Sequence, residues 1–457
     1  MTTQKGLKRV VRARMAKTGE RYAAARRALL GETSPTRATP ANPVAEAAAA
    51  MSQSPTGYGF RGGLHPDTAV LANILANRGV TSGLTGAPLS EAAILGIGGG
   101  LGAGYILWEF RVRGGAVLTL GFRNQWQYPA IPGWLGKTAE RLGVSVTPHE
   151  TSGPRKARET LDGFLDRGET VIAYVDQQEL GTWVQPAALS GCCGYPVVIA
   201  GRSEGDAYLV DDRGARPLVV PAATMAGARG RVSSFRNRLV EVSSPPVLSA
   251  DRIRDAFRAG LADQVEHLRA PSDSFSLPAW RKWSRLMTDT KNAKAWPRVF
   301  AGGRGLFGTL MSLVEGVDGG IGATGGHLRE LYAAFLDEAA NALDAPALVD
   351  AAARWRAAAD LWEDLADAAV PAELDGGAEA VEAAEELHDA VMDGEPGRRR
   401  ASGAAETTWS IRDRYADSFP LPQDRIDALL ADLERRVGEI HEAEREALGA
   451  TAAAMPR

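Results

Sequence analysis

Three short stretches of this 457-residue chain hold the side chains that we consider first as candidates for covalent catalysis. His65 opens a helix-like segment, adjacent Cys192 and Cys193 precede a strand-like run, and Asp211 and Asp212 follow another. A cysteine becomes a reactive thiolate only in an electropositive setting, and small buried cysteines commonly pack as inert hydrophobes. A lone histidine is compatible with a structural or a basic role, and two aspartates after a strand are usual in a turn. A basic group facing the aspartates across the sheet would favour a functional role for them over a role in a turn.

A glycine-rich run at residues 96–103 fits a relaxed G-x-G-x-x-A pattern. A dinucleotide site of this kind needs a strand before the glycines and an acidic residue about 20 positions later. Here a helix precedes the run, and residues 117–123 contain no carboxylate. We therefore interpret the glycines as a close-packed turn. The sequence has no phosphate-binding G-x-x-x-x-G-K-[ST] motif and no Cys/His spacing suited to zinc, so we expect no cofactor and no metal.

Charge and cysteine content limit the class of protein. The chain has 52 Lys and Arg against 56 Asp and Glu, and its net charge of -4 argues against a protein built as a whole to coat nucleic acid or an acidic membrane. Two adjacent cysteines rarely form an unstrained disulfide, which favours a reducing, cytoplasmic compartment. The basic N-terminus lacks a following apolar segment, so a secretory signal is not expected. The longest uncharged run, 92–108, contains six glycines and is interpreted as a buried turn, not a membrane span.

The order of predicted elements gives five regions. Residues 1–30 carry nine basic side chains and one acidic one, and form an amphipathic arm for a partner, for nucleic acid or for an acidic surface of the chain itself. Residues 31–57 form a flexible linker. Residues 58–245 place helices before closely spaced strands, which indicates an α+β fold. Residues 249–371 are a helical domain, and 372–457 are an acidic and helical extension, whose acidic stretch 370–400 faces solvent or the arm.

The elements within these regions follow from apolar periodicity and breaker residues. Asp67 or Thr68 is expected to cap the first helix. Strands are expected at 116–121, 144–147, 170–176, 195–200, 207–210 and 217–220. Helices are expected at 68–78, from residue 90, at 134–142, 156–167, 250–267, 278–290, 296–301, 303–313, 326–343, 345–368, 378–392, 407–415 and 423–448.

Four segments together resemble the N-terminal domain of the butirosin-biosynthesis protein H family: HPDTAVLANILANRG, PLSEAAILGIGGGLGAGY, YPVVIAG and YLVDDRG. The segments SFSLPAWRKWSRLM and GATGGHLRELYAAFLDEAA resemble the uncharacterised helical domain that usually follows it. The resemblance covers about 58–371. It implies a papain-like fold with an antiparallel sheet, related to bacteriocin-processing peptidases. It also implies a family activity in which an aminoacyl group moves from an acyl carrier protein to an aminoglycoside through a cysteine thioester.

Residue by residue, the family's catalytic positions are largely replaced. The nucleophilic cysteine falls at Pro66, the histidine base at Tyr195, and the orienting acid at Asp212 or Asp211. Proline offers no nucleophile, and tyrosine is a poor base near neutral pH. Three routes remain: Thr68 as a weak nucleophile, Cys193 as a relocated thiol, or no covalent step. In the first two, His65 would supply the base.

Two hypotheses follow. In the first, the protein is an acyl- or aminoacyl-transferase of specialised metabolism that takes its group from an acyl carrier protein and passes it to a small-molecule acceptor. Its site would comprise His65, Thr68, Cys193, Tyr195 and Asp212. In the second, it is a pseudoenzyme that binds a carrier protein, a peptide or a small molecule. The geometry of His65, Tyr195 and Asp212 discriminates between them.

Overall fold

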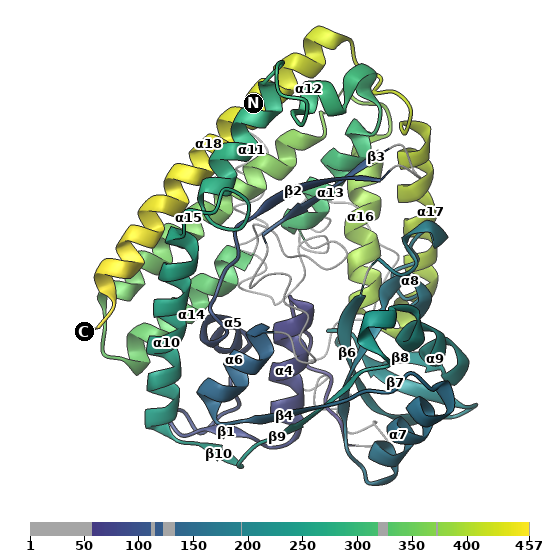
Figure 1. Ribbon diagram of the computed structural model, residues 1–457, viewed down its shortest axis with the longest axis vertical. Helices are drawn as coiled ribbons and strands as arrows, with labels where there is room; N and C mark the ends of the chain where they lie inside the picture. Colours follow the sequence, from purple (N-terminus) through teal and green to yellow (C-terminus); the bar gives the residue numbers. More distant parts are fainter. Residues whose placement is uncertain are drawn as a thin grey trace, which may run out of the picture.

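Figure 1 shows the computed structural model, which describes residues 57–110, 115–121, 133–192, 194–318, 328–371 and 373–456. The expected basic arm, all of the expected linker except Gly57, and Cys193 lie outside the described residues. Nothing in the structure therefore bears on the role of the arm.

Six antiparallel strands form the largest sheet, in the order β4-β9-β5-β6-β7-β8. Tyr174 and Val198 belong to one hydrophobic cluster, and Val175 and Val197 belong to another. Successive side chains of a strand point to opposite faces, so these near-continuous apolar runs produce a sheet that is covered on both sides. The predicted α+β fold with an antiparallel sheet is confirmed. The strands are β4 (Ser145–His149), β5 (Val171–Asp176), β6 (Gly194–Ser203), β7 (Ala207–Asp211), β8 (Leu218–Pro221) and β9 (Leu239–Ser243).

Four further strands form two small sheets. Strand β1 pairs in parallel with β10, and β2 pairs with β3 as an antiparallel hairpin that packs on α13. Their bounds are β1 (Thr81–Ser82), β2 (Tyr105–Phe110), β3 (Gly115–Leu120) and β10 (Val247–Leu248).

Six helices accompany the large sheet. Helix α4 packs on β6, whereas α9 packs on β5 and β8. Helix α9 and the interior strand β9 are not among the expected elements: the α9 segment AATMAGARGR includes two glycines, and β9 lies just ahead of a proline pair. Packing against the sheet overrides the weak local propensity in both cases. The helices are α4 (Pro66–Asn77), α5 (Glu91–Ile97), α6 (Gly133–Leu142), α7 (Pro154–Asp166), α8 (Gln177–Leu180) and α9 (Ala222–Arg231), with 3₁₀ turns η1 (Ala187–Leu189) and η2 (Ser233–Phe235).

From Ala250 onward the described chain is helical, as expected. The long helix α18 runs beside α15 and α11 along one side of the molecule (Figure 1). The elements are α10 (Ala250–Arg269), α11 (Pro278–Thr288), α12 (Trp296–Val299), η3 (Ala301–Gly303), α13 (Leu306–Asp318), α14 (Leu328–Ala342), α15 (Ala347–Ala369), α16 (Gly377–Met392), η4 (Glu395–Gly397), α17 (Arg398–Arg414) and α18 (Gln423–Ala454).

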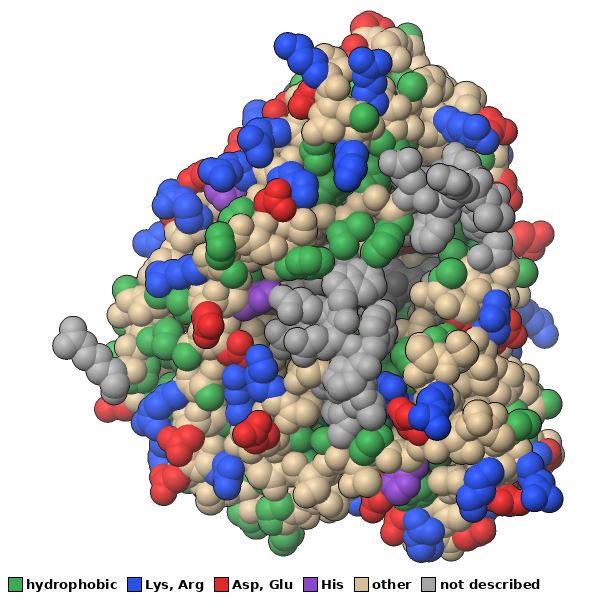
Figure 2. All heavy atoms as spheres, viewed as in Figure 1, with side chains coloured by type: hydrophobic (Ala, Val, Ile, Leu, Met, Phe, Trp, Pro, Cys, Tyr) green, Lys and Arg blue, Asp and Glu red, His purple; other side chains and the backbone are tan. Residues whose placement is uncertain are grey.

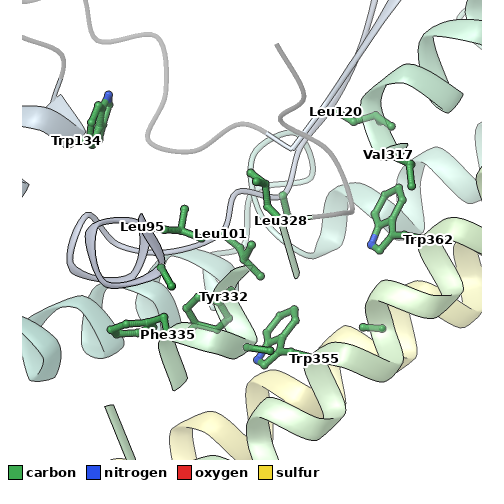
Figure 3. Close-up of a cluster of buried hydrophobic side chains, with 14 of the residues drawn as sticks. Leu95, Leu101, Leu120, Trp134, Val317, Leu328, Tyr332, Phe335, Trp355 and Trp362 are labelled. Carbon is green, nitrogen blue, oxygen red and sulfur yellow. The ribbon is translucent and has the colours of Figure 1, made fainter. Parts of the chain in front are cut away.

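The two regions share a hydrophobic core. Leu95 and Leu101, from α5 and the glycine-rich turn, lie close to Tyr332 and Phe335 of α14 (Figure 3). Helices α16 and α17 return to the large sheet, because Leu387 belongs to the same buried cluster as the strand residues Val175 and Val197. The expected domain boundaries stay a prediction, since buried clusters run across the positions where they were placed.

The glycine run packs helices together. A Cβ on Gly96 would lie 2.1 Å from the Phe335 ring, and one on Gly260 of α10 would lie 2.2 Å from the Gly96 carbonyl oxygen. Gly100 has φ +70°, and its backbone neighbour Leu101 bonds through both N–H and C=O to the Gln264 side chain. Only glycine fits such close contacts and such a φ. The run is therefore the close-packed turn that its position after a helix predicted.

A buried carboxylate lies at the centre of the helical region. Glu444 of α18 accepts hydrogen bonds from the indole N–H of Trp280 at 2.9 Å and of Trp362 at 2.7 Å, and from Arg329 Nε at 2.8 Å. Arg329 Nη2 also donates to the Gly102 carbonyl at 3.3 Å. Because Arg329 and Glu444 are 1% and 0% exposed, this ion pair ties the glycine-rich turn to the helical core.

The visible surface in Figure 2 carries Lys and Arg interspersed with Asp and Glu. Acidic residues of the C-terminal extension pair with arginines of the same extension: Glu386 and Asp393 with Arg400, and Glu373 with Arg425. In the described part of the chain, no helix has the length and apolar character needed to cross a membrane.

Candidate functional site

The first helix of the sheet region begins at Pro66, the position at which the sequence resemblance predicts the family nucleophile. Pro66 is the first residue of α4, where its missing N–H costs no helical hydrogen bond and its fixed φ suits the helix. Pro66 is buried, and it has no group that attacks a carbonyl. The preceding residue, His65, is the N-cap and 3% exposed, with Nδ1 3.9 Å from Asp67 Oδ2.

Glu91 caps α4 from another helix, so the expected capping by Asp67 or Thr68 is wrong. Its carboxylate accepts from the backbone N–H of Leu64 and of His65, each at 2.9 Å. The Thr68 hydroxyl donates to the same carboxylate at 2.8 Å. A carboxylate at a helix N-terminus is stabilised both by these donors and by the helix dipole. Thr68 is fully buried, so its hydroxyl is committed to this arrangement.

Tyr195 and Asp212 form a direct buried pair. The Tyr195 hydroxyl donates to Asp212 Oδ2 at 2.6 Å, and the Trp183 indole N–H donates to the same oxygen at 3.0 Å. Burial, followed by the charge of Asp212, raises the pKa of Tyr195 well above its usual value. Burial likewise raises the pKa of Asp212, against the opposing charge of Arg213. Tyr195 is thus a neutral donor near pH 7 and does not act as a base.

Asp211 faces the opposite side of the sheet. It lies directly across from Val198 in the strand register, on the face that α4 covers. Its Oδ2 accepts from the Tyr58 hydroxyl at 2.8 Å and from Asn73 Nδ2 of α4 at 3.1 Å. Burial raises the pKa of Asp211 to about 6. Of the two aspartates left open by the sequence, Asp212 contacts the histidine-equivalent Tyr195, and Asp211 holds the N-terminal segment and α4 to the sheet.

Arg213 connects the two parts of the site and was missed in the sequence. Its Nη1 donates to the Leu64 carbonyl at 3.2 Å, and its Nε lies 3.4 Å from Asp212 Oδ1. Its guanidinium lies over the Trp183 ring, with Cζ 5.5 Å from the ring centroid. Arg213 is 1% exposed and has φ +63°, an unusual conformation for a non-glycine residue. The sequence predicts that a basic group facing the aspartates would come from across the sheet. The basic group is instead the next residue in the chain, and that position is the only sequence signal for it.

Of the two adjacent cysteines, the structure describes only the first. Cys193 lies outside the described residues, and Cys192 is an exposed free thiol. In the described ranges, no three His, Cys, Asp or Glu side chains are grouped so as to hold a metal ion.

The site therefore has two halves joined by Arg213. His65 and Thr68 lie at the start of α4, and Tyr195 and Asp212 lie together at the sheet. Arg213 reaches Leu64, which directly precedes His65, so the halves are neighbours. The arrangement offers fixed hydrogen-bond donors and a buried guanidinium, and it offers no activated nucleophile among the described residues.

Two family models match the chain. Residues 65–213 match the family described as Butirosin biosynthesis protein H, N-terminal, and residues 228–395 match the Domain of unknown function (DUF4872). A search of curated proteins gives no match. The first match begins at the N-cap of α4 and ends at Arg213, so it spans the whole site. Residues 65–213 of the chain therefore form an N-terminal domain of the butirosin biosynthesis protein H family, with its papain-like fold, and the helical domain of unknown function follows it.

Proposed function

We propose that this protein is a non-catalytic relative of the acyl-transferring enzymes of its family, and that it binds a ligand at the papain-like site without forming a covalent acyl intermediate. The observation that carries the proposal is the Tyr195–Asp212 pair. Tyr195 stands where the family has its base, yet its hydroxyl donates a hydrogen bond to Asp212 and burial keeps it neutral.

The helix N-terminus supports the same proposal. Nucleophilic catalysis needs a group that attacks and a base within hydrogen-bond reach of it. Pro66 supplies no such group, and Thr68 is fully buried with its hydroxyl bonded to a carboxylate that also caps the helix. The family's carrier-protein and small-molecule partners become, in this proposal, binding partners, and the basic arm at residues 1–30 is a docking element for an acidic partner.

A second candidate function is acyl transfer through Thr68. The 2.8 Å contact between the Thr68 hydroxyl and Glu91 favours it, because it places a hydroxyl beside a carboxylate that could accept its proton. In this alternative Glu91 takes the role of base, and an ester forms on Thr68 Oγ1 while the carrier thiol leaves.

An acyl carrier protein loaded with a labelled acyl thioester distinguishes the two. We expect the wild-type protein to take up no covalent label and to leave the rate of thioester loss unchanged, while carrier binding is measured separately by calorimetry. Label that is recovered on wild type and lost in Thr68→Val would contradict the proposal. The matched control is Thr138→Val, which alters another fully buried threonine whose hydroxyl donates to the Trp134 carbonyl at 2.6 Å.

A further inference from the structure

In the segment 177–185 and at Arg213, five buried polar atoms have no hydrogen-bond partner in the described structure: Gln178 Oε1, Thr182 Oγ1 and three that carry the argument. Those three are Gln177 Nε2, Gln185 Oε1 and Arg213 Nη2. Their residues are 4%, 9% and 1% exposed. We call Gln177, Gln185 and Arg213 the glutamine–arginine cluster.

Contacts place these residues in one neighbourhood. Gln177 directly follows β5, whose last residue lies across from Gly194 at the start of β6, and Gln185 Nε2 donates to Gln177 Oε1 at 2.9 Å. The segment between the two glutamines contains Trp183, which bonds to Asp212 and lies under the Arg213 guanidinium. The cluster therefore borders the carboxylate that binds Tyr195.

The unpaired atoms carry an energetic cost that hydrogen bonds to a bound molecule would remove. A buried donor or acceptor without a partner costs about 1–3 kcal/mol, and more when it is charged. Such groups are rare in native proteins, and several together need a ligand or ordered water to satisfy them.

The backbone beside the cluster is strained as well. Val184 has φ +50°, which is a true outlier for a β-branched residue, and its carbonyl is held by the Trp409 indole of α17 at 3.1 Å. Backbone strain that the surrounding structure maintains is concentrated at ligand clamps and switch regions. A hydrogen bond from the C-terminal extension thus helps to hold the 181–185 segment in this conformation.

The chemistry of the three atoms defines the ligand. Arg213 Nη2 and Gln177 Nε2 are donors, and the guanidinium carries the charge that suits a carboxylate. Gln185 Oε1 is an acceptor and requires an N–H or O–H on the ligand. We propose that the glutamine–arginine cluster binds a small carboxylic acid that also bears an amino or hydroxyl group. This inference rests on the proposed function and names the ligand class of that same site.

Calorimetric titration and thermal unfolding of the full chain test the inference with glycine, L-alanine, L-serine, glycolate and L-lactate as probes. Glycinamide lacks the carboxylate, and acetate lacks the amino or hydroxyl group that would donate to Gln185 Oε1. These two compounds are therefore the matched controls. We expect at least one amino or hydroxy acid to bind and to raise the Tm, with at least about tenfold weaker binding of both controls, as the loss of one charged hydrogen bond implies. No binding by any probe, or equal binding of probes and controls, would overturn the inference, since water then fills the cluster.

Variants separate binding from folding. Arg213→Gln removes the charge and should weaken binding at least about tenfold. Because it also breaks the contacts to Asp212 and Leu64, the double variant Gln177→Met/Gln185→Met is the second test. It removes both amides and their unpaired atoms together, so we expect unchanged or higher stability without ligand and loss of binding. Gln423→Met, at an exposed position of α18, is the control.

The outcomes also separate this inference from the proposed function. If no probe binds and no acyl label is taken up, the proposed ligand site is refuted and the non-catalytic assignment stands. Covalent label on wild type together with intact probe binding removes the non-catalytic assignment and keeps the ligand site.

Discussion

The raised pKa of the buried Asp211 carboxylate should make the protein less stable as the pH rises. The pKa of Asp211 is about 6 in the folded protein and 3.8 for an ordinary aspartate. The folded state therefore retains a proton that the unfolded chain gives up between these values. The stability from this protonation is fully present below about pH 4 and is lost as the pH rises through about 6.

The size of the effect follows from the same two values. A difference of about 2 pKa units corresponds to about 3 kcal/mol, at 1.36 kcal/mol per unit. Asp211→Asn cannot ionise, so the free energy of unfolding of the variant lacks this contribution to the pH dependence. The wild-type value should fall by about 3 kcal/mol relative to the variant between about pH 4 and pH 7.

Urea unfolding monitored by tryptophan fluorescence and circular dichroism measures this difference at about pH 4, 5, 6 and 7. The comparison uses the difference between the two proteins, because groups common to both, including Asp212, then largely cancel. Asp417→Asn is the surface control, because that side chain is 90% exposed. A difference that stays constant over the range, or that moves in favour of wild type as the pH rises, would refute a raised pKa for Asp211.

Three further predictions concern single side chains, each measured by chemical unfolding. Tyr195→Phe should lower the free energy of unfolding by about 1.5–3 kcal/mol, which is the value of a hydrogen bond to a charged group. A decrease below about 0.5 kcal/mol would show that the 2.6 Å contact contributes little. Glu444→Gln should lower the free energy of unfolding by about 3–5 kcal/mol, because it leaves the buried Arg329 without its counter-charge. Adding Arg329→Met should recover part of that loss, and a double variant less stable than the single one would contradict this account. Gly96→Ala should cost at least about 1–3 kcal/mol because its Cβ meets an aromatic ring of α14, whereas Gly227→Ala, which faces open space in α9, should be neutral or stabilising. Equal effects of the two glycine substitutions would exclude close packing as the reason for Gly96.

Most of the fold could be predicted because its elements carry strong local signals. Apolar periodicity located β5 and nearly every helix of the C-terminal region, and Ser90 was correctly expected at the start of α5, where its side chain accepts from Ala93 N–H. The capping of α4 could not be predicted in the same way. Glu91 lies 26 residues after His65 in sequence and reaches it only because α5 packs against α4. The local capping signal at Asp67 and Thr68 was overridden by this tertiary contact.

The site was only partly predictable for a similar reason. Residue matching brought Tyr195 and an aspartate together, and the structure has Asp212 in contact with Tyr195. Which of two adjacent aspartates faces the tyrosine depends on strand register, because neighbouring residues of a strand point to opposite faces. The unpaired atoms of Gln177 and Gln185 could not be predicted from the sequence, because the lack of a hydrogen-bond partner depends on the folded surroundings.

The exchange of histidine for tyrosine has a physical consequence that unites these observations. A histidine bonded to a buried carboxylate is poised to take up a proton, and catalysis of acyl transfer depends on that. A buried tyrosine keeps the bond to Asp212 but remains neutral, so the carboxylate that would orient a base instead holds a fixed donor. Arg213 contacts the same carboxylate at a long 3.4 Å, and its Nη2 has no hydrogen-bond partner in the described structure. In the function proposed above, a site without proton transfer retains the charge and the hydrogen-bonding groups needed to recognise an anionic ligand, and for that reason we propose binding and not turnover at this position.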